Sequence, residues 1–290
     1  MRIFLTFAST SWHRAGVRII RQAEAMKFYD RVYSFDENAL DETFRAKYGD
    51  RLVQGSRGYG YWCWKPQIIL QVLNRMNDGD VLQYTDAGCH LNRSGRGRLI
   101  DYFDMAARSP SGVVAFQASE PSYPLPPLQC EPMDLAEYRW VKGDLLDYFS
   151  ARGDASITQS QTIGAGIIFV RKCEKGVRLI EEWASVVNDG FFLIDDTPSK
   201  SANLPGFTEH RHDQAIFSLL CKRHGVQTLS SYEYWYPKSD GKTPDWDVLR
   251  NYPIHARRDK GISIERVVLK LNRVLRETLG VVLEKKRTEQ

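Results

Sequence analysis

Several patterns that mark common protein classes are missing from this 290-residue chain. No apolar run approaches the ~20 residues that a helix needs to cross a bilayer, so no membrane-spanning helix is predicted. The chain also has no low-complexity tract, and it lacks the Gly-x-Gly-x-x-Gly, Walker A and Gly-x-Ser-x-Gly motifs. These absences exclude the commonest dinucleotide-binding, P-loop and hydrolase families of the α/β class.

Cysteine is scarce and scattered along the sequence. The five cysteines form no Cys-x-x-Cys pair, and an odd number does not suit a framework of disulfides. We therefore expect neither a disulfide scaffold nor a zinc knuckle. A reducing, cytoplasmic location follows from the same observation.

Excess charge is missing from most of the chain, although the net charge is +4. From Arg257 to the C-terminus there are ten Lys and Arg residues against five Asp and Glu, so residues 1–256 are close to neutral. A nucleic-acid-binding protein carries its basic face on the folded body. The sequence therefore predicts no nucleic-acid partner, and it assigns the basic surplus to the C-terminal tail.

Strand-like and helix-like segments alternate along the chain, whose composition, 42% apolar and 26% charged, is that of a globular protein. Such alternation is typical of βαβ units and a largely parallel sheet. We expect one α/β domain at residues 1–261, followed by a tail at 262–290. The predicted strands are 3–7, 31–35, 81–84, 112–116, 163–170 and 226–229, the predicted helices are 15–26, 66–76, 97–107, 141–149, 173–188 and 213–224, and the predicted loops are 120–132 and 194–208.

The segment 78–92 contains the first candidate for chemistry, Asp86. A turn at residues 78–80 leads into a short strand, which runs into Thr85-Asp86-Ala87-Gly88. A carboxylate at the carboxyl end of a central strand faces the crevice in which α/β sheets bind ligands. Small residues after it let a ligand approach the backbone. Alternatively, Asp86 is an N-cap or a turn former.

Four aromatic residues and two glycines precede a Lys-Pro pair in the segment 58–66. A helix start with an adjacent lysine suits a phosphate group, and nearby aromatic rings can stack on a base or a sugar. Tyr59, Trp62, Trp64 and Lys65 are therefore candidates for ligand binding. The alternative is an aromatic cluster that covers the core, with Lys65 in solvent.

Three further segments carry weaker signals. Gly164-Ala165-Gly166 lets a ligand or another backbone approach a strand, although a packing role is the simpler explanation. The segment 210–214, His-Arg-His-Asp-Gln, opens a helix, where Asp213 would act as the N-cap and the two histidines would face solvent. The segment 255–260 combines one histidine with three cations, which suits a diphosphate or an ordinary solvated loop.

Taken in chain order, these motifs resemble those of a GT-A fold glycosyltransferase, of the kind that bacteria use to build surface polysaccharides. The residues that carry the resemblance are Gly-Tyr-x-x-Trp-Lys-Pro at 60–66 and Gly-Asp-x-x-x-Tyr-x-Asp-Ala-Gly at 79–88. Gly164-Ala165-Gly166 and the Asp213-Gln214 pair are similar to elements of family 8 and family 32 enzymes. The resemblance covers about residues 1–261 and implies a Rossmann-like, mostly parallel sheet.

The resemblance also implies roles for individual residues. Asp86, Asp213 and Gln214 are implied to be catalytic. Asp86 together with His255, or with His90 as a substitute, is implied to bind Mn²⁺ or Mg²⁺ with the help of the donor's phosphates.

One departure from the family pattern bears on the metal. Position 88 is Gly, where these enzymes usually carry a second Asp, so a metal-free mechanism with Lys65 and Arg257 neutralising the diphosphate stays open. The implied donor-binding residues are Ala8, Ser9, Thr10, Tyr59, Trp62, Trp64, Lys65, Ala87, Gly88, Gly164, Ala165, Gly166 and Arg257.

The activity that the resemblance implies is transfer of a hexose from a nucleotide-diphosphate sugar, most simply a UDP-sugar, to a glycan or lipid-linked acceptor. One rival is a non-catalytic nucleotide-sugar or polysaccharide-binding module on the same fold. Another is a metal-dependent phosphohydrolase, but that class needs more clustered carboxylates and histidines than the chain offers in one place.

The tail reads as a basic amphipathic helix. Apolar residues recur at helical spacing between 264 and 279, and Arg266, Lys270, Arg273 and Arg276 crowd the opposite face. Such a helix can lie on an anionic membrane surface, which would make the protein peripheral on the inner face of the membrane. Packing against the body or a second subunit explains the same pattern.

Overall fold

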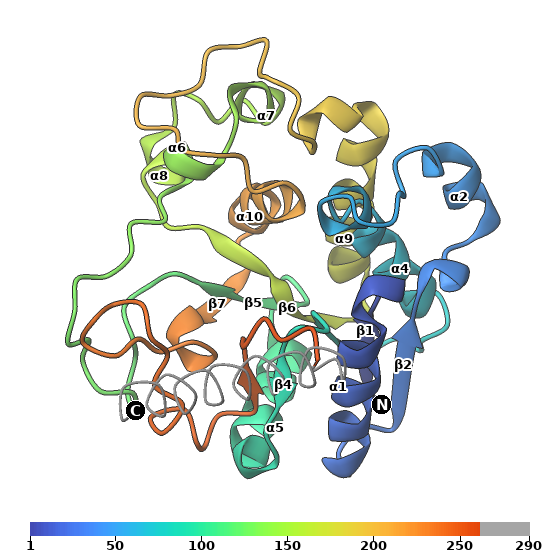
Figure 1. Cartoon of the computed structure of the whole chain (residues 1–290), viewed down its shortest axis with the longest axis vertical. Coiled ribbons are helices and arrows are strands. Elements are labelled where there is room, and N and C mark those ends of the chain that lie inside the picture. The colour runs from blue at the N-terminus through green and yellow to red at the C-terminus, as the bar shows by residue number, and fades with distance from the viewer. Residues whose placement is uncertain (262–290) are drawn as a thin grey trace, which may run out of the picture.

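A mixed sheet of six strands, in the order β2-β1-β3-β6-β5-β7, runs through the centre of the computed structural model, which describes residues 1–261 (Figure 1). Five strands share one direction, because β1 pairs in parallel with β2 and β3, and β5 with β7. β6 runs antiparallel to both of its neighbours, β3 and β5. The strands are β1 (Arg2–Phe7), β2 (Arg31–Phe35), β3 (Val81–Thr85), β5 (Val113–Gln117), β6 (Ile163–Arg171) and β7 (Gln227–Ser230).

The predicted α/β class and mostly parallel sheet are confirmed, and each of the six predicted strands corresponds to a strand of this sheet. The direction of β6 was not predicted. Pattern reading cannot supply it, because a buried strand is apolar on both faces whichever way it runs. The amphipathic helix predicted for the tail lies outside the described residues.

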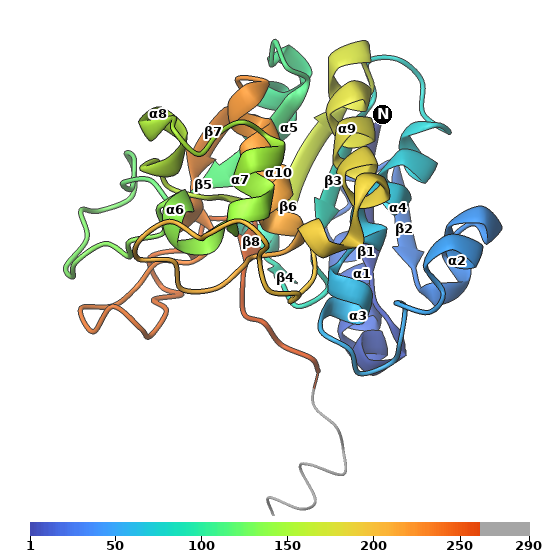
Figure 2. The same ribbon diagram turned by 90° about the horizontal axis from the view of Figure 1, so that it is seen from above.

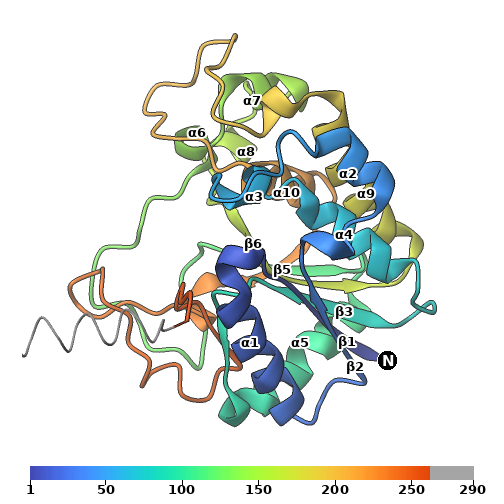
Figure 3. The same cartoon turned by 45° about the vertical axis from the view of Figure 1, so that its right-hand side comes forward.

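Helices cover both faces of the sheet, as Figure 3 shows. Side chains alternate along each strand, so in β1 Leu5 packs against α4 and α9 while Phe4 packs against α1 and α5. Within residues 1–261, no helix combines the length and the apolar character that crossing a bilayer would require. The covering helices are α1 (His13–Ala25) and α5 (Arg96–Arg108) on one face, and α4 (Trp64–Leu73), α9 (Glu174–Asp189) and α10 (Asp213–Arg223) on the other.

Shorter elements fill the connections. The predicted helix 141–149 is present only as the shorter α7. The other short elements were not predicted, because a helix of fewer than about two turns shows no readable hydrophobic periodicity. The short elements are α2 (Glu42–Tyr48), α3 (Gly58–Tyr61), α6 (Glu137–Trp140), α7 (Gly143–Tyr148), α8 (Ala155–Thr158), the strands β4 (His90–Leu91) and β8 (Ile254–His255), and 3-10 turns at Thr10–Trp12, Glu37–Ala39, Arg93–Gly95, Phe191–Leu193 and Ser231–Glu233.

Two long loops, residues 120–132 and the loop between the 3-10 turn Ser231–Glu233 and β8 (Ile254–His255), support each other. Tyr236 donates its hydroxyl to the carbonyl oxygens of Pro126 (3.2 Å) and Pro127 (2.8 Å). Leu125 packs with Tyr236 and Leu249 in a small apolar cluster of its own. Figure 2 shows the two loops side by side, away from the helices that cover the sheet. The predicted irregular segment 120–132 is thus confirmed as an ordered loop.

The C-terminal end of the described chain returns to the first half. β8 pairs with β4 in a small antiparallel sheet, which puts His255 opposite His90. Gly95 makes this return possible, because a Cβ atom added there would lie 2.2 Å from the backbone of Pro253. As a result, the segment 256–261 passes next to the turn that follows β3.

Candidate active site

A cavity of about 730 Å³ opens where β1 and β3 end and β6 begins. Its volume suits a ligand of cofactor size, and its position matches the carboxyl edge at which α/β sheets bind ligands. The structure brings most of the predicted site residues together here. Those that line the cavity are Ser9, Tyr59, Trp62, Trp64, Lys65, Asp86, Ala87, Gly88, Gly164, Ala165, Gly166, Asp213 and Gln214.

Asp86 presents its carboxylate to the cavity from the end of β3. Its Oδ1 atom accepts a hydrogen bond from the Tyr84 hydroxyl at 2.7 Å, and its side chain is 39% exposed. Within residues 1–261 no backbone N–H donates to this carboxylate, so the side chain is not an N-cap. The Asp86 backbone does open a turn, because its carbonyl oxygen accepts the Cys89 N–H at 2.9 Å, so the turn alternative is correct for the backbone alone. Gly166 is necessary for the arrangement, since a Cβ atom there would lie 2.9 Å from Asp86 Oδ2.

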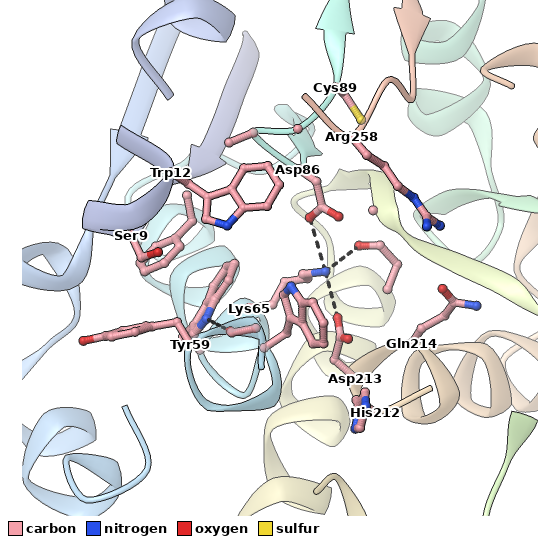
Figure 4. Close-up of a pocket in the computed structure, with 18 of the residues that line it drawn as sticks. Ser9, Trp12, Tyr59, Lys65, Asp86, Cys89, His212, Asp213, Gln214 and Arg258 are labelled. Carbon is pink, nitrogen blue, oxygen red and sulfur yellow. Dashed lines mark hydrogen bonds and ion pairs between the residues drawn. The ribbon is translucent and has the colours of Figure 1, made fainter. Parts of the chain in front are cut away.

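Lys65 is buried, and its ammonium group joins the two candidate catalytic carboxylates (Figure 4). The Nζ atom lies 2.7 Å from Asp213 Oδ2 and 3.3 Å from Asp86 Oδ1, and it donates to the Ala165 carbonyl oxygen at 3.1 Å. The alternative that left Lys65 in solvent is therefore wrong. Burial opposes the charge, but the two carboxylates outweigh burial and raise the pKa of Lys65. One hydrogen bond and two ion pairs therefore hold the ammonium as a fixed part of the site.

Asp213 is the first residue of α10 and is buried. His212, not Asp213, occupies the N-cap position, so the capping role considered for Asp213 is wrong. Burial raises the pKa of Asp213 to about 6, with Lys65 opposing the rise and Asp86 adding to it. The folded protein therefore holds a proton on Asp213 at a pH where an ordinary aspartate is ionised.

If Asp213 acts in its ionised form next to Lys65, the rate of the activity that the motifs imply is expected to rise with pH through about 6. Stability should change in the opposite sense. Between 3.8 and about 6 the folded state binds the Asp213 proton and the unfolded state does not, so the contribution of Asp213 to the free energy of unfolding falls as pH rises. Turnover and denaturant unfolding, each measured against pH, check both signs. The difference between the parent and Asp213→Asn at each pH isolates this contribution from the other groups that titrate in the same window, and a difference that does not change with pH would contradict the assignment.

The aromatic segment 58–66 serves two purposes. Trp64 is buried, stacks on Phe7 with ring centroids 3.9 Å apart, and donates its Nε1–H to the Gly58 carbonyl at 3.0 Å. Tyr59 and Trp62 instead keep one side on the cavity. Both have positive φ angles, 52° and 59°, which non-glycine residues adopt at a cost and mostly near functional sites. Core packing thus explains Trp64, and ligand contact is open to the other two.

His210 and His212 are buried, so the expectation that they face solvent is wrong. His210 Nε2 lies 2.9 Å from the Leu193 carbonyl oxygen, and His212 Nδ1 lies 2.7 Å from that of Ile194. Burial lowers the pKa of both rings, which therefore stay neutral and hold the loop before them. His212 has a φ of 54° and a ψ of −124°, and it sets the direction in which α10 presents Asp213.

Other predicted donor residues lie away from the cavity. Ala8 is buried in the core beside α1, and the exposed Thr10 donates its N–H to Glu37. Only Ser9 of the 8–10 loop lines the cavity. Arg257 stacks over Trp246, with its guanidinium 4.6 Å from the ring centroid, and it is Arg258 that lines the cavity.

The residues present do not fit the Mn²⁺ or Mg²⁺ site that the resemblance implies. His255 is buried, stacks on Trp246 and has its Nε2 atom 3.0 Å from the Leu249 carbonyl oxygen, outside the cavity lining. His90 is paired with Asp259 at 3.0 Å, also outside the lining. No three His, Cys, Asp or Glu side chains among residues 1–261 come together as a metal site. Asp86 is left with an ammonium neighbour in place of further ligands.

Several residues that line the cavity were not among the predicted site residues. Tyr84, the hydrogen-bond donor to Asp86, was detectable, because residues two apart on a strand share a face. Trp12, Arg211, Arg258 and Lys260 also line the cavity, but they come from segments that only the tertiary fold brings together. Arg211 lies in the segment 210–214, and Arg258 and Lys260 lie in the cationic segment 255–260, whose composition suits a diphosphate, so only Trp12 lies outside the segments that the sequence singled out.

The sequence matches no protein-family model and no curated protein. Among solved structures, mouse xyloside xylosyltransferase 1 matches with a TM-score of 0.45 and 11% identity, over 88% of this chain and 97% of that one. A glycosyltransferase involved in glycosylation of the major capsid of PBCV-1 matches at 0.44 and 9%, over 88% and 91%. The galactosyltransferase LgtC, with donor and acceptor sugar analogs, matches at 0.44 and 14%, over 88% and 86%. These structural matches are to glycosyltransferases, the class that the sequence motifs resemble.

Proposed function

We propose that this protein is a glycosyltransferase that moves a hexose from a nucleotide-diphosphate sugar to a glycan or lipid-linked acceptor. The observation that carries the proposal is the Asp86–Lys65–Asp213 bridge in a cavity at the carboxyl edge of the sheet. Buried charges are costly to place, and a network of this kind in a ligand-sized cavity is typical of a catalytic site.

The two carboxylates suit the sugar of the donor. Carboxylate oxygens accept hydrogen bonds from sugar hydroxyls, and a negative charge near the reacting carbon stabilises the positive charge that develops there. Gln214 follows Asp213 on α10 and also lines the cavity, so it can add a neutral donor and acceptor. Lys65 keeps the two carboxylates in position and prevents them from repelling each other.

The walls of the cavity suit the nucleotide. Trp12, Tyr59 and Trp62 expose ring surface on which a base or ribose can stack, and Ser9 and Ser11 add hydroxyl groups. A UDP-sugar is the donor that we favour. A role in bacterial surface polysaccharide synthesis, in the cytoplasm or at the inner membrane face, follows from the resemblance and belongs to this proposal.

Incubation with a panel of UDP-, GDP-, CDP- and ADP-sugars tests the proposal. We expect slow release of one nucleoside diphosphate by hydrolysis, because water can replace the acceptor, and faster release when glycan acceptors are added. Coupled detection of the released nucleotide measures both rates. If calorimetry shows that the protein binds a nucleotide sugar but no nucleoside diphosphate is released, the rival function, a non-catalytic binding module, is correct.

A further inference from the structure

We propose that this site binds the donor's diphosphate without a divalent metal ion, through the cationic side chains of Arg258 and Lys260. This inference rests on the proposed function, since it concerns how the same donor is held. It follows from three features of the cavity: the carboxylates that it offers, the space beside Gly88, and the cations that have no carboxylate partner in the described part of the chain.

The carboxylates of the cavity are already committed. Asp86 and Asp213 are the acidic residues of its lining, and both lie next to the Lys65 ammonium. A magnesium or manganese ion takes several oxygen ligands from carboxylates, phosphates and water. Here a fixed cation, Lys65, already stands between the two carboxylates that would have to supply them.

The space beside Gly88, where the family pattern would place a second carboxylate, is occupied by Arg258 and Trp12. A Cβ atom added to Gly88 would lie 3.3 Å from Arg258 Cα and 3.2 Å from the Trp12 ring. Any side chain at position 88 would therefore press on the segment that carries Arg258. Glycine at this position allows that close approach, so the absence of a carboxylate at position 88 and the presence of Arg258 beside it belong to one arrangement.

The segment that carries the two cations is held in place. Asp259 donates its N–H to the Gly88 carbonyl at 3.0 Å. The Arg18 guanidinium donates to the carbonyls of Ala87 (2.9 Å) and Asp259 (3.0 Å), which ties the segment to the turn after β3. Arg258 itself has a φ of 51°, an unusual conformation for a residue with a side chain. These bonds fix the backbone from which Arg258 enters the cavity.

Among residues 1–261, Arg258 and Lys260 are the lining cations that have no carboxylate partner. Arg57 and Arg211 pair with Glu209 at 3.5 and 3.3 Å, whereas Arg258 and Lys260 have no carboxylate partner within residues 1–261. Lys260 lies over the Trp12 ring, 5.0 Å from its centroid. Figure 4 shows the Arg258 side chain extending from beside Cys89 toward Gln214. Guanidinium and ammonium groups bind phosphate oxygens strongly, so a diphosphate is the ligand that this pair would take.

Calorimetry with UDP, GDP, CDP and ADP tests this inference in the full-length protein. Each titration is run once with EDTA and once with MnCl₂, for the parent, for Arg258→Ala and for the adjacent Arg257→Ala as the matched control. We expect the best nucleotide to bind equally well in both buffers. Arg258→Ala should weaken its binding by about 10- to 100-fold, as for the loss of a charge-assisted hydrogen bond, and Arg257→Ala should leave it unchanged.

The outcomes separate this inference from the proposed function. Binding that needs MnCl₂ overturns the metal-free site and leaves a metal-dependent glycosyltransferase standing. Binding that is equal in Arg258→Ala and the parent overturns the assignment of the diphosphate to Arg258. Absence of binding by all four nucleotides in both buffers overturns the donor assignment and with it both proposals. A melting temperature equal to that of the parent shows that each variant is folded.

Discussion

Replacement of Asp86 by Asn is expected to lower turnover of the nucleotide sugar by about 10²-fold or more, because a charge aimed at the reacting sugar is lost. Asn has the same size as Asp, and its side-chain oxygen can still accept the hydrogen bond that the Tyr84 hydroxyl donates to Asp86 Oδ1 at 2.7 Å in the parent. The half-exposed carboxylate contributes little to folding, so the free energy of unfolding should change by about 1 kcal/mol or less. Steady-state kinetics and denaturant unfolding measure the two quantities.

Asp78→Asn is the matched control for this variant. Asp78 is exposed and precedes the same strand, at the end away from the cavity. It should behave as the parent in both measurements. Turnover close to that of the parent in a folded Asp86→Asn protein would remove Asp86 from the catalytic site.

Lys65→Met should be the most damaging substitution for stability. It leaves the buried Asp213 carboxylate without its partner, and breaking a buried ion pair typically costs about 3–5 kcal/mol. The loss should be larger at pH 8 than at pH 5, because the pKa of Asp213 is about 6 and its protonated form needs no cation. Urea denaturation at the two pH values measures the difference, and activity should be lost at both.

A second substitution shows whether the buried charge is the cause. Lys65→Met combined with Asp213→Asn removes both members of the pair, so it should recover much of the lost stability and none of the activity. Lys175→Met, at an exposed position of α9, controls for the change of residue type. A loss that is independent of pH, with no recovery in the double variant, would mean that Lys65 matters for packing alone.

Much of the fold was predictable because its signals are local. Alternating strands and helices indicated the α/β class, and the strand that ends at Asp86 indicated the edge at which the cavity lies. Asp86 was selected from a short motif, Asp213 and Gln214 were selected through the family resemblance, and the structure brings all three to the same cavity. Motifs of this kind can be read in a sequence because the strand or helix start that presents each residue is encoded within a few neighbouring positions.

The contacts that define the chemistry were decided by the tertiary structure. Lys65 lies between two carboxylates that come from distant segments of the chain. The sequence allowed Lys65 to face solvent, but the side chain is buried because α4 brings it against Ala165 of β6 and Asp213 of α10. The exchange of Arg257 for Arg258 depends on the return of the chain past Gly95 and Gly88. The side chains of neighbouring residues point in different directions, and the surface on which this segment packs selects the one that enters the cavity. A local sequence pattern cannot predict that surface, because the surface is formed by segments that are far away in the sequence.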